Sequence, residues 1–417
     1  MNFSHIANKL RSKITRFSGI LSQDLDKTAR RFVREAIYGI MASQSVMLTD
    51  IGRQQESKVS LKKTEERYSR QLNKPGIWAC LHQRILSMTS SRVKDRTLLI
   101  LDLSDLKKKY AEKMEHLATV WDGSEGGDLV GGYWTNQVIA SEVDSNEIIP
   151  MHFSLYSHTS PGFQGENNQI IQAMDQVGSA VQNRGIWIID RGGDRDALYE
   201  SLLKNNRDFI VRMVGKRDVI YAGNKARSLW LAHSCRVPYK KSFVRLIHGK
   251  EVQYNIRFGS VPVQLPDMDV PLHMVVVQGI SNKPMMLLTT LKIKPGEKDL
   301  WFIIQAYMKR WSIEETIRFI KQTYDLENIR VLKYRRLQNM MAILLAVFYF
   351  VAVILDQNQK LTIMAGHVLK CAKRVFGIPD FKYYALGDGL FNIFSRFPGQ
   401  LQNPKKIPQF QLSFGFT

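Results

Sequence analysis

The stretch TLLILDL, residues 97–103, is a nearly continuous apolar run that contains one carboxylate, Asp102. This pattern is typical of a β-strand that is buried on both faces. A second stretch, GIWIID (residues 185–190), has the same character and ends in Asp190. An ionised aspartate in such a strand costs several kcal/mol to bury unless a cation or hydrogen bonds compensate its charge. The two stretches therefore indicate either hydrogen-bonded structural aspartates or ligands of a bound cation.

A third carboxylate lies on a helical pattern that runs from Asp299 to Thr323. At about 100° per residue, four polar side chains fall within a stripe of about 60°. They are Tyr307, Arg310, Glu314 and Lys321. Beside the stripe lie three isoleucines that we expect to pack against the core, Ile313, Ile317 and Ile320. Glu314 would then stand at the edge of the core between two cations.

Three carboxylates of this kind match the needs of phosphodiester cleavage. Two divalent ions held about 3.5–4 Å apart prepare the attacking oxygen and the leaving oxygen. Hard oxygen ligands favour Mg²⁺ or Mn²⁺. The simpler alternative for the helical stripe is a surface ion pair between Arg310 and Glu314, which would contribute about 0.3–0.5 kcal/mol.

The charge of the chain favours a polyanionic partner. Its 417 residues include 59 Lys and Arg against 38 Asp and Glu, which gives a formal net charge of +21. Each phosphate that Lys or Arg neutralises releases condensed counterions, so this surplus favours nucleic acid. An acidic membrane surface is the alternative that composition alone leaves open.

Short basic helices are predicted near the N-terminus. A helical pattern covers residues 23–42, Thr49 or Asp50 suits the N-cap of a short second helix, and Ser60 suits that of a third over residues 61–72. Two short helices across a tight turn, the second strongly basic, suit a helix-turn-helix-like reader of DNA. A solvated basic face is the alternative interpretation.

The middle of the chain alternates short strand-like runs with turns. Residues 119–155 predict hairpins that pair with the strand of Asp102, and residues 167–182 and 196–206 have helical patterns. From Asp208 to about Lys294, β-branched and aromatic runs alternate with Gly, Pro and Asn turns. This region is therefore predicted to be a mostly β insertion.

No segment has the pattern of a membrane span or a secretory signal. The longest apolar run, Met340 to Leu355, is shorter than the roughly 18 to 20 residues that cross a bilayer, and we interpret it as a buried helix. The first 17 residues interleave basic and apolar side chains. Cys80, Cys235 and Cys371 have no metal-binding spacing. These features favour a cytoplasmic protein with reduced cysteines.

The polar stripe on the helix carries a resemblance to a known family. The signature Y-x2-R-x3-E-x6-K of transposases of bacterial insertion sequences, insertion-sequence-four type, is present without gaps from Tyr307 to Lys321. DLSDL (residues 102–106) is similar to the D-T-T-E-L-like stretch of that family, and DRGGD (residues 190–194) to its D-R-E-A-D-like stretch. The resemblance covers roughly residues 23–355.

This resemblance implies a DDE transposase of the α/β class, with a ribonuclease-H-like catalytic core, a mostly β insertion and an α-helical N-terminal DNA-binding domain. The catalytic and metal-binding residues would be Asp102, Asp190 and Glu314, which would hold two ions of Mg²⁺ or Mn²⁺. The DNA-binding residues would be Tyr307, Arg310 and Lys321. The implied partners are double-stranded DNA, as terminal inverted repeats and target, and a second copy of the chain in a homodimer. The protein would be nucleoid-associated.

The expected domain boundaries follow from these patterns. Residues 1–75 would bind DNA, residues 76–207 and 296–375 would form the two parts of the catalytic core, residues 208–295 would be the β insertion, and residues 376–417 would be a tail that is a candidate for oligomerisation. Removal of the first of these segments should abolish selective DNA binding and leave charge-driven binding.

One position departs from the family pattern. Some members flip a base next to the cut and stack it on a Trp of the insertion, but the aligned position here is Met286. Cleavage through a DNA hairpin is therefore an open question, and Trp230 and Tyr254 are both candidates for a stacking surface.

The function expected from the sequence is cut-and-paste transposition. Water would attack the phosphodiester at the element end, and the freed 3′-OH would attack target DNA. Asp105, Asp194 and Glu315 are not expected to be catalytic, and Glu315 lies about 100° around the helix from Glu314. The alternative is an inactive DNA-binding relic or inhibitor, against which the three intact carboxylates count.

Overall fold

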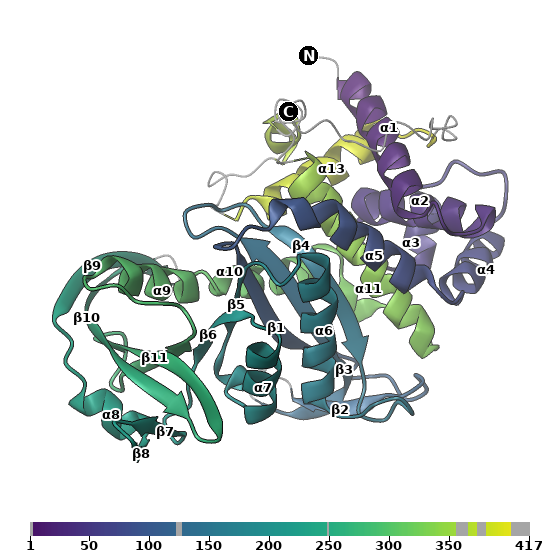
Figure 1. The fold of residues 1–417 in the computed structure, drawn as a ribbon. Helices are drawn as coiled ribbons and strands as arrows, with labels where there is room; N and C mark the ends of the chain where they lie inside the picture. The colour runs from purple at the N-terminus through teal and green to yellow at the C-terminus, as the bar shows by residue number, and fades with distance from the viewer. Residues whose placement is uncertain (1–2, 122–126, 248–249, 356–365, 373–380, 402–417) are drawn as a thin grey trace.

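The computed structural model describes residues 3–121, 127–247, 250–355, 366–372 and 381–401. Within this part of the chain, 12 strands form one sheet. Helices cover both faces of one half of the sheet, and the other half curves into a separate lobe (Figure 1). The structure is therefore mixed α/β, as predicted.

Five strands form the half of the sheet that carries Asp102 and Asp190, in the order β4-β3-β1-β5-β6. Their bounds are β1 (Leu98–Lys107), β3 (Leu129–Ser141), β4 (Ile149–Tyr156), β5 (Ile186–Ile189) and β6 (Asp208–Arg212). β1, β3 and β4 pair antiparallel, whereas β1, β5 and β6 run parallel. β2 (Ala118–Trp121) pairs with the start of β3, so the predicted hairpins beside the strand of Asp102 are confirmed.

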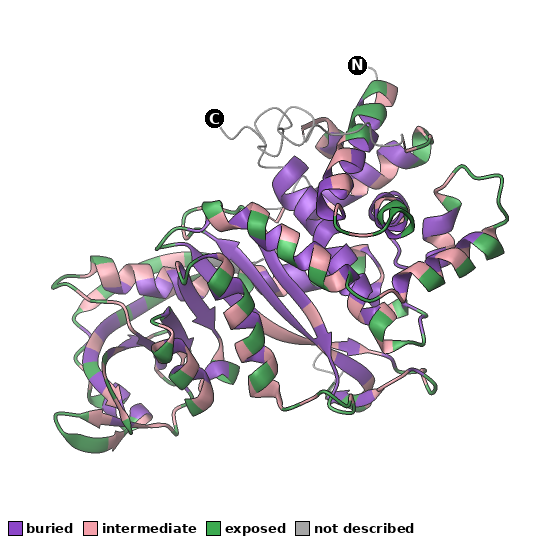
Figure 2. Cartoon of the chain, turned by 45° about the vertical axis from the view of Figure 1, so that its right-hand side comes forward, coloured by how far each residue is buried: buried purple, intermediate pink, exposed green. Residues whose placement is uncertain are grey.

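The central strands are buried on both faces, as the two apolar runs predicted. Successive side chains of β1 enter different cores: Leu98 and Ile100 join one hydrophobic cluster, and Leu99 and Leu101 join the other. Helices α6 (Glu166–Ala180) and α7 (Asp196–Lys204) pack on the second of these cores. Figure 2 shows these strands as the buried centre of the molecule.

The lobe extends the sheet without a break, because β6 pairs with β12 as well as with β5. The other pairs of the lobe are β12 with β11, β11 with β10, and β10 with β9 and β7. The bounds are β7 (Asp218–Tyr221), β8 (Asn224–Arg227), α8 (Ser228–Ser234), β9 (Tyr239–Ile247), β10 (Lys250–Leu265), β11 (Met268–Gln278) and β12 (Met285–Thr289). The mostly β character predicted for this region is confirmed.

Among the described residues, five α-helices precede the sheet, and their bounds are α1 (Phe3–Leu21), α2 (Lys27–Ser43), α3 (Leu48–Arg53), α4 (Leu61–Leu72) and α5 (Ile77–Thr89). The predicted third basic helix matches α4, with Ser60 at its N-cap position but without a side-chain cap bond. The prediction that Thr49 or Asp50 caps α3 is wrong. Met47 holds that position, and Asp50 lies in the first turn and pairs with Arg53.

These helices share a hydrophobic core with α11 (Tyr334–Tyr349) and its continuation Phe350–Leu355. Phe17 of α1 stacks on Tyr349 with ring centroids 5.8 Å apart. The amide of Asn339 donates to the carbonyls of Leu72 and Lys74, each at 2.8 Å. Within the described residues, Tyr334–Leu355 is the one helix long and apolar enough to cross a membrane, and it is 94% buried over its apolar window. The buried helix predicted for this run is confirmed.

The C-terminal region contributes a helix that the sequence pattern did not predict. α13 (Tyr383–Arg396) packs against α2, and the rings of Tyr38 and Phe394 meet edge to face with centroids 5.0 Å apart. Residues 376–380 and 402–417 of the predicted tail lie outside the described residues.

Candidate active site

Asp102 lies in the middle of β1, level with Asp190, which directly follows the parallel strand β5. The register of β1 and β5 pairs Leu98 with Ile186 and continues to Leu101 with Ile189. One further residue along each strand places the two aspartates next to each other, at the spacing of about 4.8 Å between neighbouring strands. Two carboxylates that are 88 positions apart in the sequence thus lie next to each other in the central sheet.

The Asp190 side chain is held by a tight turn. Its Oδ1 accepts the backbone N–H of Gly192 at 2.7 Å and caps the 3₁₀ turn η2 (Arg191–Gly193). A Cβ on Gly193 would stand 2.4 Å from Cγ2 of Ile189, so only glycine fits at that position. The glycines of DRGGD therefore let the chain turn directly after Asp190.

The helix that carries Glu314 begins later than predicted. The pattern expected over residues 299–323 is two helices, α9 (Lys298–Met308) and α10 (Trp311–Thr323), with Arg310 at the N-cap position of α10. Tyr307 therefore lies on α9, where it is 5% exposed, and the prediction of one continuous stripe is wrong. The three isoleucines predicted to pack inward are buried, Ile313, Ile317 and Ile320.

Arg310 joins two of the carboxylates. Its Nη1 donates to Oδ2 of Asp102 at 3.1 Å, and its Nη2 donates to Oε1 of Glu314 at 2.5 Å. Arg310 is 8% exposed, and its Nε has no hydrogen-bond partner among the described residues. The alternative prediction of an ion pair between Arg310 and Glu314 is therefore confirmed, but its placement at the surface is wrong. The pair lies inside the site, and Arg310 also pairs with Asp102.

Burial raises the pKa of Asp102 to about 7. Arg310 lowers this pKa, whereas the charges of Asp190 and Glu314 raise it, and the backbone N–H of Leu103 lowers it slightly. The three carboxylates therefore share one electrostatic environment, and the single guanidinium between them does not fully compensate their charge.

This pKa predicts a pH-dependent penalty on folding. Between about pH 4 and pH 7, the folded protein retains a proton on Asp102 that the unfolded chain has released, so wild-type stability falls as pH rises through this window. Asp102→Asn removes the penalty. Relative to wild type, the variant should gain roughly 2.5 kcal/mol of unfolding free energy between about pH 5 and about pH 8. Urea unfolding in metal-free buffer measures this, and a difference that does not change with pH would contradict it.

Lys321 forms a second contact between α10 and β1. Its Nζ lies 3.2 Å from Oδ1 of Asp105 and 3.2 Å from Oε1 of Glu327. Seven residues along a helix and three residues along a strand both span about 10 Å. The spacing from Glu314 to Lys321 on α10 therefore equals that from Asp102 to Asp105 on β1. The sequence reasoning identified Lys321 but missed its acidic partners, because Asp105 is 216 positions away.

The donor set suits a hard divalent cation, although its present arrangement is not that of a metal centre. Among the described residues, no group of three or more His, Cys, Asp or Glu side chains is arranged to hold a metal ion. Three carboxylates against one arginine nevertheless leave an excess of negative charge, and all the donors are oxygens. The residues therefore fit Mg²⁺ or Mn²⁺ by chemistry, provided that Arg310 leaves its position between Asp102 and Glu314.

The candidates for a stacking surface in the lobe differ in exposure. Met286 is buried in β12, and Tyr254 stacks on Phe243 with ring centroids 5.4 Å apart. Trp230 on α8 is 63% exposed and lines a pocket of about 430 Å³ together with cationic side chains. Of the two candidates left open by the sequence, Trp230 is the more exposed and Tyr254 is only partly exposed.

Comparisons with known proteins give one family and a distant structural likeness. The family model described as "Transposase DDE domain" matches residues 94–350. A cryo-EM structure described as a piggyBac transposase synaptic complex with hairpin DNA has 10% sequence identity and a TM-score of 0.42, and the match covers 96% of this chain and 84% of that chain. None of the curated proteins matches.

Proposed function

The chain belongs to the family of transposases with a DDE domain, whose model matches 94–350, and we propose that it is the transposase of a bacterial insertion sequence. It would cut DNA at the ends of its element and join those ends to target DNA by a cut-and-paste route. The observation that carries the proposal is the proximity of three carboxylates, Asp102 in β1, Asp190 after β5 and Glu314 on α10.

The proposed core is ribonuclease-H-like. Support comes from the strand order β4-β3-β1-β5-β6, with three antiparallel strands followed by two that are parallel to β1. We propose residues 76–207 and 296–375 as the two parts of this core, residues 208–295 as its insertion, and residues 1–75 as a DNA-binding domain. The exposed basic residues of α4 support the last assignment.

The proposed site residues act on a phosphodiester at the element end. Asp102, Asp190 and Glu314 would hold two divalent cations, which activate the attacking oxygen and stabilise the leaving one. The oxygen of water forms a bond to phosphorus, the bond to the 3′-oxygen breaks, and that oxygen takes up a proton. The resulting 3′-OH then attacks a phosphodiester of the target in the same way.

Arg310 and Lys321 are the proposed phosphate contacts, with Tyr307 beside them. Both cations lie within reach of the carboxylates in the described structure, so they would exchange a carboxylate for a DNA phosphate when DNA binds. Two element ends have to be held together during transposition, so we propose that a homodimer forms in the DNA complex, with residues 376–417 as a candidate contact.

The proposed function predicts Mg²⁺-dependent cutting at the element ends. Purified full-length protein, incubated with the terminal DNA of its own element and Mg²⁺, should nick the strand at the boundary of the element and leave a 3′-OH. Strand mapping on sequencing gels and a chelator control measure this. Selective DNA binding without any cutting would contradict the proposed enzymatic activity. It would favour the alternative function, an inactive DNA-binding relic.

A further inference from the structure

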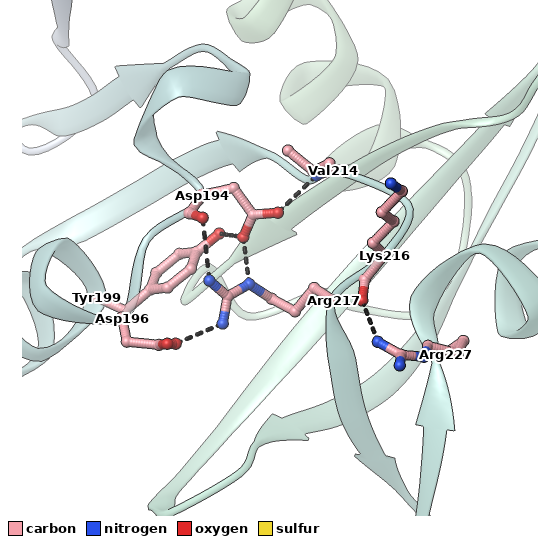
Figure 3. Close-up of polar contacts among 7 residues, drawn as sticks. All are labelled: Asp194, Asp196, Tyr199, Val214, Lys216, Arg217 and Arg227. Atoms are coloured by element: carbon pink, nitrogen blue, oxygen red, sulfur yellow. Dashed lines mark hydrogen bonds and ion pairs between the residues drawn. The ribbon is translucent and has the colours of Figure 1, made fainter.

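A buried ionic cluster joins the turn after Asp190 to the first loop of the lobe (Figure 3). At its centre is Asp194, whose side chain is 1% exposed. Its Oδ2 accepts the backbone N–H of Val214 at 2.5 Å, and its Oδ1 accepts the hydroxyl of Tyr199 at 3.0 Å. Oδ1 also accepts from Nε of Arg217. Both oxygens of this carboxylate are therefore used inside the protein.

Arg217 is fixed from several sides. Its Nη2 donates to the main-chain carbonyl of Asp194 at 3.0 Å, and its guanidinium lies over the ring of Tyr199, 5.1 Å from the centroid. Its Nη1 pairs with Asp196. The Arg217 side chain is 14% exposed and that of Asp196 is 70% exposed, so Arg217 has one carboxylate partner in the interior and one at the surface. Exposed pairs contribute little, whereas buried ones are costly to break.

The cluster connects two parts of the chain that matter for the proposed site. On one side, Asp190 and Asp194 are the residues that flank the turn η2, and the N–H of Asp194 donates to the carbonyl of Arg191 at 3.2 Å. On the other side, Val214 and Arg217 belong to the connection from β6 to β7 that leads into the lobe. Arg227 of β8 donates to the carbonyl of Lys216 in the same loop, so this hydrogen bond links the loop to β8 (Figure 3).

We propose that Asp194 and Arg217 form a clamp that positions the metal ligand Asp190. By anchoring the far end of η2 to the loop 214–217, the clamp fixes the turn whose Gly192 N–H orients the Asp190 carboxylate. Asp194 is thus a positioning residue and does not itself touch the metals or the DNA. The proposal rests on the proposed function, because Asp190 needs a fixed orientation only if it holds a metal.

The chemistry of the clamp makes a conservative substitution informative. Asp194→Asn keeps the shape of the side chain but replaces one acceptor oxygen by an NH₂ group. Since donors face both oxygens, that NH₂ would meet either the N–H of Val214 or the donors of Arg217 and Tyr199. Asp196→Asn is the matched control, because it removes the other carboxylate partner of the same arginine at the protein surface.

The test measures backbone protection, metal binding and cutting in the full-length chain. In Asp194→Asn, amide hydrogen exchange should accelerate in peptides that cover residues 190–194 and 213–217. Mn²⁺ binding, followed by electron paramagnetic resonance with pre-cut terminal DNA bound, should weaken about 10- to 100-fold, as for other residues that orient metal ligands. The Mg²⁺ concentration for half-maximal cutting should rise by a similar factor. Asp196→Asn should match wild type in all three measurements.

A purely structural role gives a different result. It would lower the melting temperature of Asp194→Asn but leave Mn²⁺ affinity and Mg²⁺ dependence unchanged in the folded protein, and this outcome overturns the proposal. If Asp194→Asn does not fold, Arg217→Lys is the second variant, because it keeps the buried charge but loses the fork of donors. Wild-type metal affinity in Arg217→Lys would equally overturn the clamp.

The wild-type measurements separate this proposal from the proposed function. If the wild-type protein and the clamp variants bind Mn²⁺ and cut DNA equally well, the positioning role of the clamp is overturned. The proposed function is then still supported. Wild-type protein that neither binds Mn²⁺ nor cuts DNA overturns the proposed function, and the positioning role fails with it.

Discussion

Glu314→Gln is expected to reduce Mg²⁺-dependent cutting about 1,000-fold, because removing one charge from the metal ligands removes about 4 kcal/mol of transition-state stabilisation. Folding should change little. The Glu314 side chain is 31% exposed, and the residue lies in the first turn of α10. Its ion pair with Arg310 is one of two that this arginine makes. The measurement is single-turnover cutting of terminal DNA, together with urea unfolding of the same preparation.

The neighbouring residue supplies a matched control. Glu315 is on the same turn of α10 and pairs with Arg318 at 2.5 Å on the surface of the protein. Glu315→Gln removes an identical group but should cut at the wild-type rate. A wild-type cutting rate in Glu314→Gln would contradict the assignment of Glu314 to the active site. An equal loss of cutting in both variants would show that the effect arises from a change in α10 as a whole.

Deletion of residues 1–75 is expected to unfold the rest of the protein, which differs from the selective loss of DNA binding that the sequence suggested. α11 and its continuation are buried partly by α1, α2 and α4, which belong to the same hydrophobic core. Each large apolar side chain left exposed costs about 1.5–3 kcal/mol. Exposure of several on Tyr334–Leu355 would exceed the roughly 5–15 kcal/mol by which domains are stable.

Circular dichroism and size-exclusion chromatography of the truncated chain measure this effect. A soluble, folded protein of residues 76–417 with the melting temperature of the full chain would contradict it. DNA binding by the N-terminal helices is better tested by replacing exposed cations of α4 with glutamine, namely Lys62, Lys63 and Arg70. This variant should stay folded and reduce the slope of log K against log salt by about three if all three contact phosphates.

Local sequence patterns predicted the secondary-structure elements whose type is determined by residues that are close together in the sequence. The apolar runs that lead to Asp102 and Asp190 identified β1 and β5 and their burial on both faces, because a strand buried between two layers has to be apolar throughout. The bounds of α4 were predicted to the residue. Turn-rich β-branched runs likewise predicted the lobe, since short strands and glycine turns are properties of neighbouring residues.

Other local predictions failed where the surrounding structure decides the outcome. The periodicity of residues 299–323 fits one helix, yet the helix is interrupted at Lys309 and Arg310, so Tyr307 lies on α9 and Glu314 on α10. The tail had no clear period, yet α13 forms where α2 offers an apolar face to pack against. Helical periodicity reports which side chains are apolar, but it does not report where a helix has to end to follow the core.

The sequence by itself determined which carboxylates are the proposed catalytic residues and the kinds of strand and helix that carry them. Only the tertiary structure decided that β1 and β5 pair in the register that sets Asp102 beside Asp190, and that Arg310 reaches Asp102 across 208 positions of the chain. It also decided that the buried carboxylate of Asp194 accepts hydrogen bonds from Val214 and Arg217. The physical reason is that local patterns arise from interactions between near neighbours, whereas strand register and buried ion pairs are selected by the packing of the whole core.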